Sequence, residues 1–111
     1  MTDTPDTIVD VGTKTKSKTK KPPRYHVMLL NDDFTPMDFV VWILSNIFNK
    51  NETDSTQIML DVHEKGSAIV GTYRLEIAEQ KIYETMETAR LNEYPLKAKL
   101  IVEDGDEDGE S

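Results

Sequence analysis

Three consecutive polar residues, Asn31, Asp32 and Asp33, carry the clearest chemical potential in this sequence, and they directly follow the apolar run 27–30. Short side chains of this kind favour a turn, because they hydrogen-bond to nearby backbone groups. His63 is the other candidate. Carboxylate and amide oxygens and a neutral imidazole are all hydrogen-bond acceptors. If these side chains meet, they would suit a compact cation with several N–H donors, such as an α-ammonium group.

Apolar side chains accompany both polar candidates. Met37 and Val40 follow the polar loop within one helical turn, and Met59 and Val62 immediately precede His63. Taken singly, these residues are typical of a turn, a core or an exposed helix end, and only their convergence would make a site. If they converge, an apolar hole would lie beside the acceptors. The residues then favour a receptor for a free protein N-terminus that begins with a large apolar residue.

Two catalytic interpretations of the same residues are weaker. Asp32, Asp33 and His63 could bind a divalent metal, but the sequence has no second histidine in range and no recognisable ligand spacing. Asp32 and His63 could also form a base and its orienting partner, yet no Ser or Cys nucleophile motif accompanies them. We therefore expect a binding protein that is not an enzyme and uses no metal or cofactor.

Composition narrows the range of partners and compartments. The chain has 111 residues and a formal net charge of −8, which disfavours nucleic acid and anionic membranes as partners. There is no cysteine, so disulfides and thiolate zinc sites are excluded, as suits a reducing compartment. No apolar run approaches the roughly 20 residues of a membrane span. We expect a soluble, monomeric cytoplasmic protein.

The two ends of the chain differ in composition from the middle. Residues 1–22 are polar, with lysines that alternate with Thr and Ser, and we expect a disordered N-terminal extension. This extension could be a solvated tail, an arm that engages a partner or, least favoured, a contact to nucleic acid. Residues 103–111 form an acidic segment that we expect to be a disordered tail. One folded domain is predicted over residues 23–102.

The middle of the chain predicts three strands and three helices. A strand is expected over residues 24–30, followed by a helix with Thr35 as N-cap, Pro36 at its first position and Asp38 closing a capping box. A second helix is predicted to begin at residue 53 or 54 and to stop at Gly66. A strand over 68–73, a helix over 75–91 and a strand over 96–102 complete the pattern.

This order, β-α-α-β-α-β, favours an α+β fold. We expect a two-layer sandwich with a three-stranded, mostly antiparallel sheet and three helices on one face. In the third helix, Ala78, Ile82, Met86 and Ala89 are predicted to face inward, whereas Lys81 and neighbouring glutamates are predicted to face solvent.

Several segments closely resemble the ClpS adaptors. The first is Tyr25-x-Val27-x-Leu29-x-Asn31-Asp32-Asp33-Phe34-Thr35-Pro36-Met37-x-Phe39-Val40, and the second is Gln57-Ile58-Met59-Leu60-x-Val62-His63-x-x-Gly66. The resemblance continues through Glu76-Ile77-Ala78-Glu79-x-Lys81 and ends at Pro95-Leu96, so it covers roughly residues 23–102. One departure is Arg74, which stands where the family usually has Ser or Thr before the third helix.

The resemblance implies a function and assigns roles to residues. Members bind proteins whose first residue is Leu, Phe, Tyr or Trp and deliver them to a ClpA-type AAA+ unfoldase of the Clp protease. The residues that it implies for binding the amine are Asn31, Asp32 and His63. Those implied for the side-chain pocket are Thr35, Met37, Val40, Met59, Val62 and Leu96. Those implied for docking on the unfoldase's N-terminal domain are Glu76 and Lys81. The N-terminal extension would engage the unfoldase, and Met37 would reject β-branched first residues.

One alternative from another class stays open at this point. A non-catalytic acidic interaction domain of the ribosomal-stalk type would share the small α+β architecture and the acidity. Such a domain would bind its partners through an outer helix surface and would need no amine pocket. The arrangement of the polar loop, His63 and the methionines distinguishes the two hypotheses. Within the polar loop, Asp33 is expected to hold the loop while Asn31 and Asp32 contact the ligand.

Overall fold

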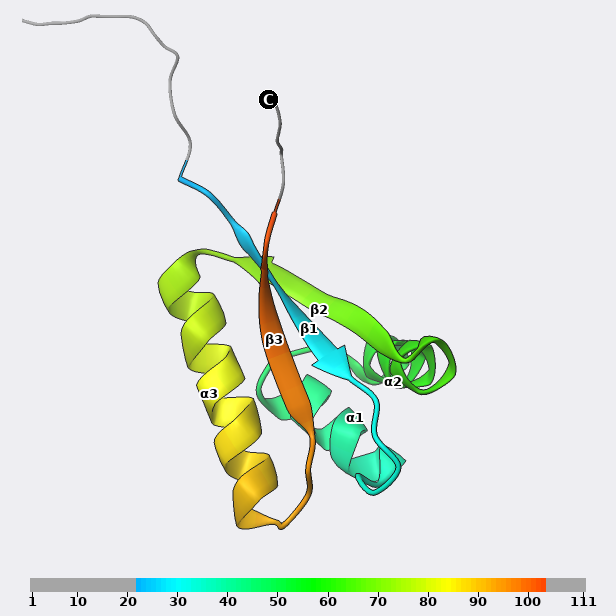
Figure 1. The fold of residues 1–111 in the computed structure, drawn as a ribbon. Coiled ribbons are helices and arrows are strands. Elements are labelled where there is room, and N and C mark those ends of the chain that lie inside the picture. Colours follow the sequence, from blue (N-terminus) through cyan, green and yellow to red (C-terminus); the bar gives the residue numbers. More distant parts are fainter. Residues whose placement is uncertain (1–21, 104–111) are drawn as a thin grey trace, which may run out of the picture.

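Three strands and three helices follow one another in the order that the sequence predicts. The structure is a computed structural model and describes residues 22–103. Its elements are β1 (Tyr25–Leu30), α1 (Met37–Asn46), α2 (Glu52–Lys65), β2 (Ser67–Tyr73), α3 (Leu75–Leu91) and β3 (Lys97–Val102). The three strands lie side by side as one sheet and the helices pack against it (Figure 1). The predicted α+β fold is confirmed.

β1 is the central strand of the sheet, whose order is β2-β1-β3. It pairs with both neighbours antiparallel, so that Tyr25 lies opposite Tyr73 on one side and Val102 on the other. A β-bulge interrupts the pairing with β2 between Val27 and Met28. Because β1 is extended and pairs along its whole length, its two ends lie at opposite ends of the sheet, and the chain can build a separate surface at each end.

The core lies between the helices and one face of this sheet. Side chains alternate between the two faces of a strand, and Val27 and Leu29 of β1 are 0% exposed, whereas Met28 between them is only half-buried. Val40, Ile43 and Leu44 of α1 belong to the same core. The buried hydrophobic residues are Val27, Leu29, Val40, Ile43, Leu44, Phe48, Val62, Val70, Ala78, Ala89, Leu96 and Ala98.

The predicted start of α1 is wrong in its capping. The N-cap residue is Pro36, which makes no side-chain cap hydrogen bond, and the helix begins at Met37. Thr35 does not cap the helix, because its hydroxyl donates instead to Asp32 Oδ2 at 2.7 Å. This hydrogen bond is charge-assisted, because its acceptor is an ionised carboxylate, and it holds the Thr35 side chain to the loop.

The start of α2 also differs from the prediction, by one to two residues. The helix begins at Glu52, because Asn51 is the N-cap and its side chain accepts a hydrogen bond from the Asp54 N–H at 2.7 Å. The predicted end at Gly66 is confirmed. Gly66 has φ 90°, a left-handed conformation that glycine adopts without steric cost, and its N–H donates to the Val62 carbonyl.

α3 keeps its predicted bounds but turns a slightly different face inward. Ala78, Thr85 and Ala89 are buried, whereas Met86 is 37% exposed. Arg74 is the N-cap and makes no side-chain cap hydrogen bond. Lys81 was predicted to face solvent, and this is wrong. Its Nζ is half-buried and donates to the carbonyl of Ile47, just beyond the end of α1, at 2.8 Å.

The predicted disorder of residues 1–22 and 103–111 falls outside the described residues, apart from Pro22 and Glu103 at their edges. At that boundary, Glu103 N–H donates to the Arg24 carbonyl at 2.8 Å, which extends the β1–β3 pairing by one step. Within residues 22–103, none of the helices has the length and apolar character that crossing a membrane requires.

Candidate functional site

The loop between β1 and α1 is organised by the side chain of Asp32. Its Oδ1 accepts hydrogen bonds from the Phe34 N–H at 2.8 Å and the Thr35 N–H at 2.7 Å. Its Oδ2 accepts from the Thr35 hydroxyl. The expectation that Asp33 holds the loop is therefore wrong, because Asp32 does so, and Asp33 is exposed. The reason is local: a carboxylate accepts readily from N–H groups two and three residues further along the chain.

A backbone hydrogen bond brings this loop to the end of α2. The N–H of Asn31 donates to the carbonyl of Gly66 at 2.9 Å. Gly66 follows directly after the last turn of α2, and that turn carries His63. The glycine therefore ends the helix and, through its carbonyl, fixes the polar loop beside His63, although the two lie about 30 residues apart in the sequence.

The polar loop, the start of α1 and the end of α2 enclose one cavity of about 360 Å³. The structure brings together here all three residues implied for the amine and five of the six implied for the apolar pocket. The cavity is lined by Asn31, Asp32, Asp33, Phe34, Thr35, Pro36, Met37, Val40, Met59, Val62 and His63. Acceptors and apolar side chains thus converge, as the hypothesis of an amine receptor requires.

Leu96 is the pocket residue that the structure places elsewhere. It is 3% exposed in the core and lines a second cavity, together with Tyr83, Met86 and residues near the end of α3. The two residues implied for docking, Glu76 and Lys81, lie on α3, away from the cavity lining. Glu76 is exposed and pairs loosely with Arg74, at 4.0 Å, whereas Lys81 binds the Ile47 carbonyl.

Asp33, Phe34 and Pro36 line the cavity but were not predicted to do so. Phe34 is the most exposed large hydrophobic residue described, at 77%. A signal was present in the sequence, because an aromatic residue between Asp33 and Thr35 stands in a loop where only polar turn residues are needed. Nothing in the spacing indicates, however, which way such a side chain points.

Electrostatics keep the Asp32 carboxylate charged. Burial alone would raise the pKa of Asp32, but the hydrogen bonds from the Thr35 hydroxyl and from the Phe34 and Thr35 amides outweigh burial and lower it below its ordinary value. The cavity therefore presents a negative charge at neutral pH. Within the part of the chain that the structure describes, no three His, Cys, Asp or Glu side chains cluster as metal ligands would.

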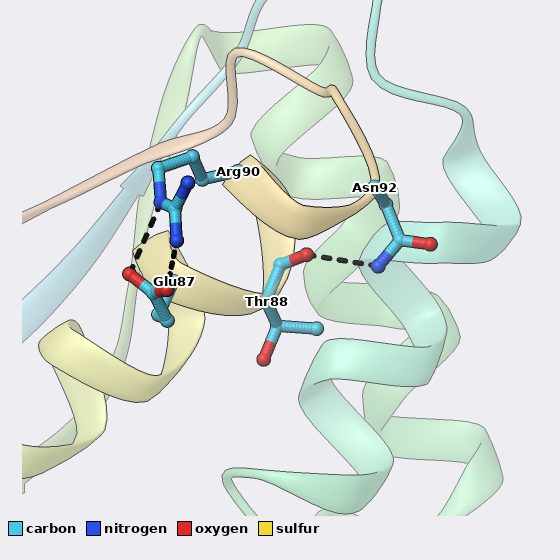
Figure 2. A network of polar contacts seen from close by, with 4 residues as sticks. All are labelled: Glu87, Thr88, Arg90 and Asn92. Carbon is cyan, nitrogen blue, oxygen red and sulfur yellow. Dashed lines mark hydrogen bonds and ion pairs between the residues drawn. The ribbon is translucent and has the colours of Figure 1, made fainter.

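The second cavity, also of about 360 Å³, is chemically different. Its carboxylate is already paired, since Glu87 accepts hydrogen bonds from Arg90 Nε at 3.2 Å and from Arg90 Nη2 (Figure 2). This hydrogen bonding lowers the pKa of Glu87. Nearby, the Asn92 side chain donates to the Thr88 carbonyl and closes the end of α3 (Figure 2). Because the charges here satisfy one another, this cavity is a poorer place for a cation.

A third cavity, of about 490 Å³, lies where the described chain begins. It is lined by Pro22, Pro23, Arg24, Thr72, Tyr73, Arg74 and Ile77. Its two arginines disfavour a cationic ligand. Of these three cavities, the one at the end of β1 therefore fits an ammonium group best.

Comparisons with known proteins identify one family. Residues 20–99 match the family model described as ATP-dependent Clp protease adaptor protein ClpS. The ATP-dependent Clp protease adapter protein ClpS of Ruegeria sp. (strain TM1040) is 46% identical over 106 residues, which cover 94% of this chain and 94% of that protein. The protein of the same name from Roseobacter denitrificans is 50% identical over 99 residues, covering 89% and 88%.

A solved structure supports the same assignment. Agrobacterium tumefaciens ClpS2 bound to L-phenylalaninamide has a TM-score of 0.73 and 36% sequence identity, and the match covers 75% of this chain and 100% of that chain. The similar fold and the match of the family model to residues 20–99 lead to the same family. The chain belongs to the ClpS family of ATP-dependent Clp protease adaptor proteins.

Proposed function

We propose that this protein is an adaptor that binds proteins with a large hydrophobic N-terminal residue (Leu, Phe, Tyr or Trp). It would deliver them to a ClpA-type AAA+ unfoldase for degradation by the Clp protease. The observation that carries this proposal is the cavity at the end of β1, which combines acceptors with an apolar wall in a member of the ClpS family. The similar Agrobacterium ClpS2 was solved with L-phenylalaninamide, which has a free amine and a phenyl side chain on one carbon.

Asn31, Asp32 and His63 would hold the α-ammonium group. A carboxylate offers about four acceptor positions, and three of those of Asp32 are used by the loop. One position therefore stays open for an ammonium N–H, and Asn31 and His63, which line the same cavity, would supply an amide oxygen and an imidazole nitrogen. An N-acetylated terminus has neither the charge nor the three donors, so it would bind poorly.

Thr35, Met37, Val40, Met59 and Val62 would surround the first side chain. Val40 and Val62 are 7% and 3% exposed and form a fixed floor, whereas Met37 is 44% exposed at the mouth. Unbranched methionines adapt their shape to flat aromatic or branched aliphatic groups. Met37 would still exclude a first residue that branches at Cβ. We leave Leu96 out of this lining, because it lies at the second cavity.

Docking and delivery would use the opposite end of the sheet. Glu76 is exposed at the start of α3 and lines a cavity with Pro22 and Pro23, where the N-terminal extension joins the folded part. We propose that Glu76 contacts the unfoldase's N-terminal domain, that Lys81 assists from the same helix, and that residues 1–22 engage the unfoldase during transfer.

The protein would act by binding alone. We propose that it is not an enzyme, needs no cofactor, and works as a cytoplasmic monomer that binds neither nucleic acid nor membranes. Support comes from the cysteine-free sequence, its net charge of −8 and the adaptor names of its relatives.

A peptide panel tests the binding step. Fluorescence anisotropy would compare peptides that start with Phe, Leu, Val or Ala and are otherwise identical, together with an N-acetylated Phe peptide. Phe and Leu should bind at least tenfold more tightly than Val or Ala, and acetylation should abolish binding. Equal affinity for all five would contradict the proposal. Degradation of a Phe-initiated reporter by the unfoldase and its peptidase, with and without the adaptor, tests delivery.

A further inference from the structure

We propose that Phe34 contacts the second residue of the bound peptide and makes the protein prefer a large apolar residue at that position. The inference rests on the proposed function, because it takes the first residue to lie in the cavity at the end of β1. It adds a specificity-determining residue to the amine and pocket groups described above.

Phe34 stands apart from the other two phenylalanines of the chain. Phe48 is 4% exposed in the core, and Phe39 packs against Tyr94, with ring centroids 4.7 Å apart. Phe34 is 77% exposed and yet lines the ligand cavity. Its ring thus contributes little to the core and forms part of the cavity mouth.

The backbone of Phe34 is held in place. Its N–H donates to Asp32 Oδ1 at 2.8 Å, and the next N–H, that of Thr35, donates to the same oxygen. A peptide would therefore meet a ring whose attachment point is already ordered, which lowers the entropic cost of the contact. The 44% exposed Met37 lines the same cavity and extends the apolar mouth.

Peptide geometry brings the second residue to this mouth. Consecutive Cα atoms lie about 3.8 Å apart, so a peptide whose amine is held by Asn31, Asp32 and His63 leaves the cavity within one residue. In an extended chain, successive side chains point to opposite sides. When the first side chain enters the cavity, the second points out of it, toward the exposed apolar surface of the mouth. A large apolar second residue would remove part of the Phe34 ring from water.

Two matched peptides and one single-residue ligand separate this contact from the first-residue pocket. The peptides begin Phe-Trp and Phe-Gly and are otherwise identical, and L-phenylalaninamide ends before the second residue. We expect the wild-type protein to bind the Phe-Trp peptide about fivefold more tightly than the Phe-Gly peptide. In Phe34→Ser this ratio should fall to near one. The affinity of Phe34→Ser for L-phenylalaninamide should change much less than its affinity for the Phe-Trp peptide. The variant Phe34→Leu should keep part of the preference for Phe-Trp over Phe-Gly.

Tyr83→Ser is the matched control, because Tyr83 is a similarly exposed aromatic residue (68%) at the second cavity. It should keep the wild-type ratio. A ratio that survives in Phe34→Ser would overturn the inference. An equal loss for the amide and both peptides in Phe34→Ser would also overturn it, because Phe34 would then belong to the first-residue pocket. Failure of the wild-type protein to bind the amide at all would instead overturn the proposed function, and this inference with it.

Discussion

The carboxylate of Asp32 serves both the structure of the loop and the proposed binding of the ligand. It orders the loop through three hydrogen bonds, and it leaves one acceptor position for a cation. The neighbouring Asp33 lines the same cavity, but it is exposed and takes no part in those bonds. Two adjacent residues of the same type thus allow the role of charge in the cavity to be separated from the role of loop geometry.

Replacing Asp32 by Ala should weaken binding of L-phenylalaninamide by roughly tenfold to a hundredfold, the value of a charge-assisted hydrogen bond. The same substitution at Asp33 should cost less than threefold, because it keeps the loop bonds. Isothermal titration calorimetry on both variants measures this difference. Equal losses for the two variants would show that only the summed negative charge of the cavity matters.

The lowered pKa of Asp32 predicts a dependence of stability on pH. Because the folded state holds the carboxylate ionised below its ordinary pKa of 3.8, this group stabilises the fold fully above that value. The contribution is lost as the pH falls through the lower, folded-state pKa. Urea unfolding should therefore show wild type losing more stability than Asp32→Asn between pH 4 and about pH 2.5, and the same amount between pH 7 and 5. Parallel curves over the whole range would contradict this.

At the scale of residues, the sequence predicts the chemical character of a side chain better than the place of that side chain in the fold. The polar loop and His63 could be identified as acceptors because their side-chain chemistry is independent of the fold. Leu96 could not be placed, since alternation along a strand tells which face a residue occupies and not which of two cavities it borders. Phe34 was missed for a related reason: exposure of an apolar side chain depends on what packs around it, and one loop contains no periodic pattern.

At the scale of elements, Lys81 links α3 to the end of α1. Its Nζ donates to the Ile47 carbonyl, one of the carbonyls left without an intrahelical partner at a helix end. The same ammonium group lies 5.8 Å from the Phe48 ring centroid and 5.6 Å from that of Tyr73. A cation at a helix C-terminus and over aromatic faces is favourable on both counts.

Replacing Lys81 by Met should lower the free energy of unfolding by about 1–2 kcal/mol, because the aliphatic stem stays while the hydrogen bond and the cation–π contacts are lost. Lys65→Met is the control. Lys65 is exposed and forms a loose ion pair with Asp61 at 3.8 Å, so this substitution should lower the free energy of unfolding by less than about 0.5 kcal/mol. Urea unfolding of the two variants decides. If both changed stability equally, Lys81 would be an ordinary surface residue, free to serve in docking alone.

The periodicity of apolar residues predicted the order and approximate position of the helices and strands. It could not predict the details that depend on hydrogen bonds of single side chains, such as the start of α2 and the orientation of Lys81. The apolar spacing of α1 and α3 reflects packing on one sheet face, which many residues determine together. The start of α2 depends on a single hydrogen bond, which the Asn51 side chain accepts from the Asp54 N–H. Lys81 was predicted to face solvent because it is charged, although a long side chain can reach a carbonyl on a neighbouring element.

At the scale of the whole molecule, β1 separates two surfaces. The ligand cavity is lined by the loop that directly follows the last residue of β1, Leu30, whereas Glu76 lines another cavity together with Pro22, Pro23 and the first residue of β1, Tyr25. In Figure 1, α3 starts near the beginning of β1 and α1 lies toward the other end of the strand. A strand of six residues spans roughly 17–20 Å. A substrate can therefore occupy one end of the domain while a partner engages the other, without competition for the same atoms.

This separation predicts that binding and delivery can be lost independently. Removal of residues 1–20 should leave the affinity for a Phe-initiated peptide within twofold of wild type, because the cavity is lined only by residues between Asn31 and His63. The same truncation should slow adaptor-dependent degradation at least tenfold, since the unfoldase would have no extension to engage. Removal of residues 104–111 is the control, and it should preserve both measurements. A truncated adaptor that still delivers its substrate at the wild-type rate would place the unfoldase contact wholly on the folded domain, where Glu76→Ala would then be the decisive variant.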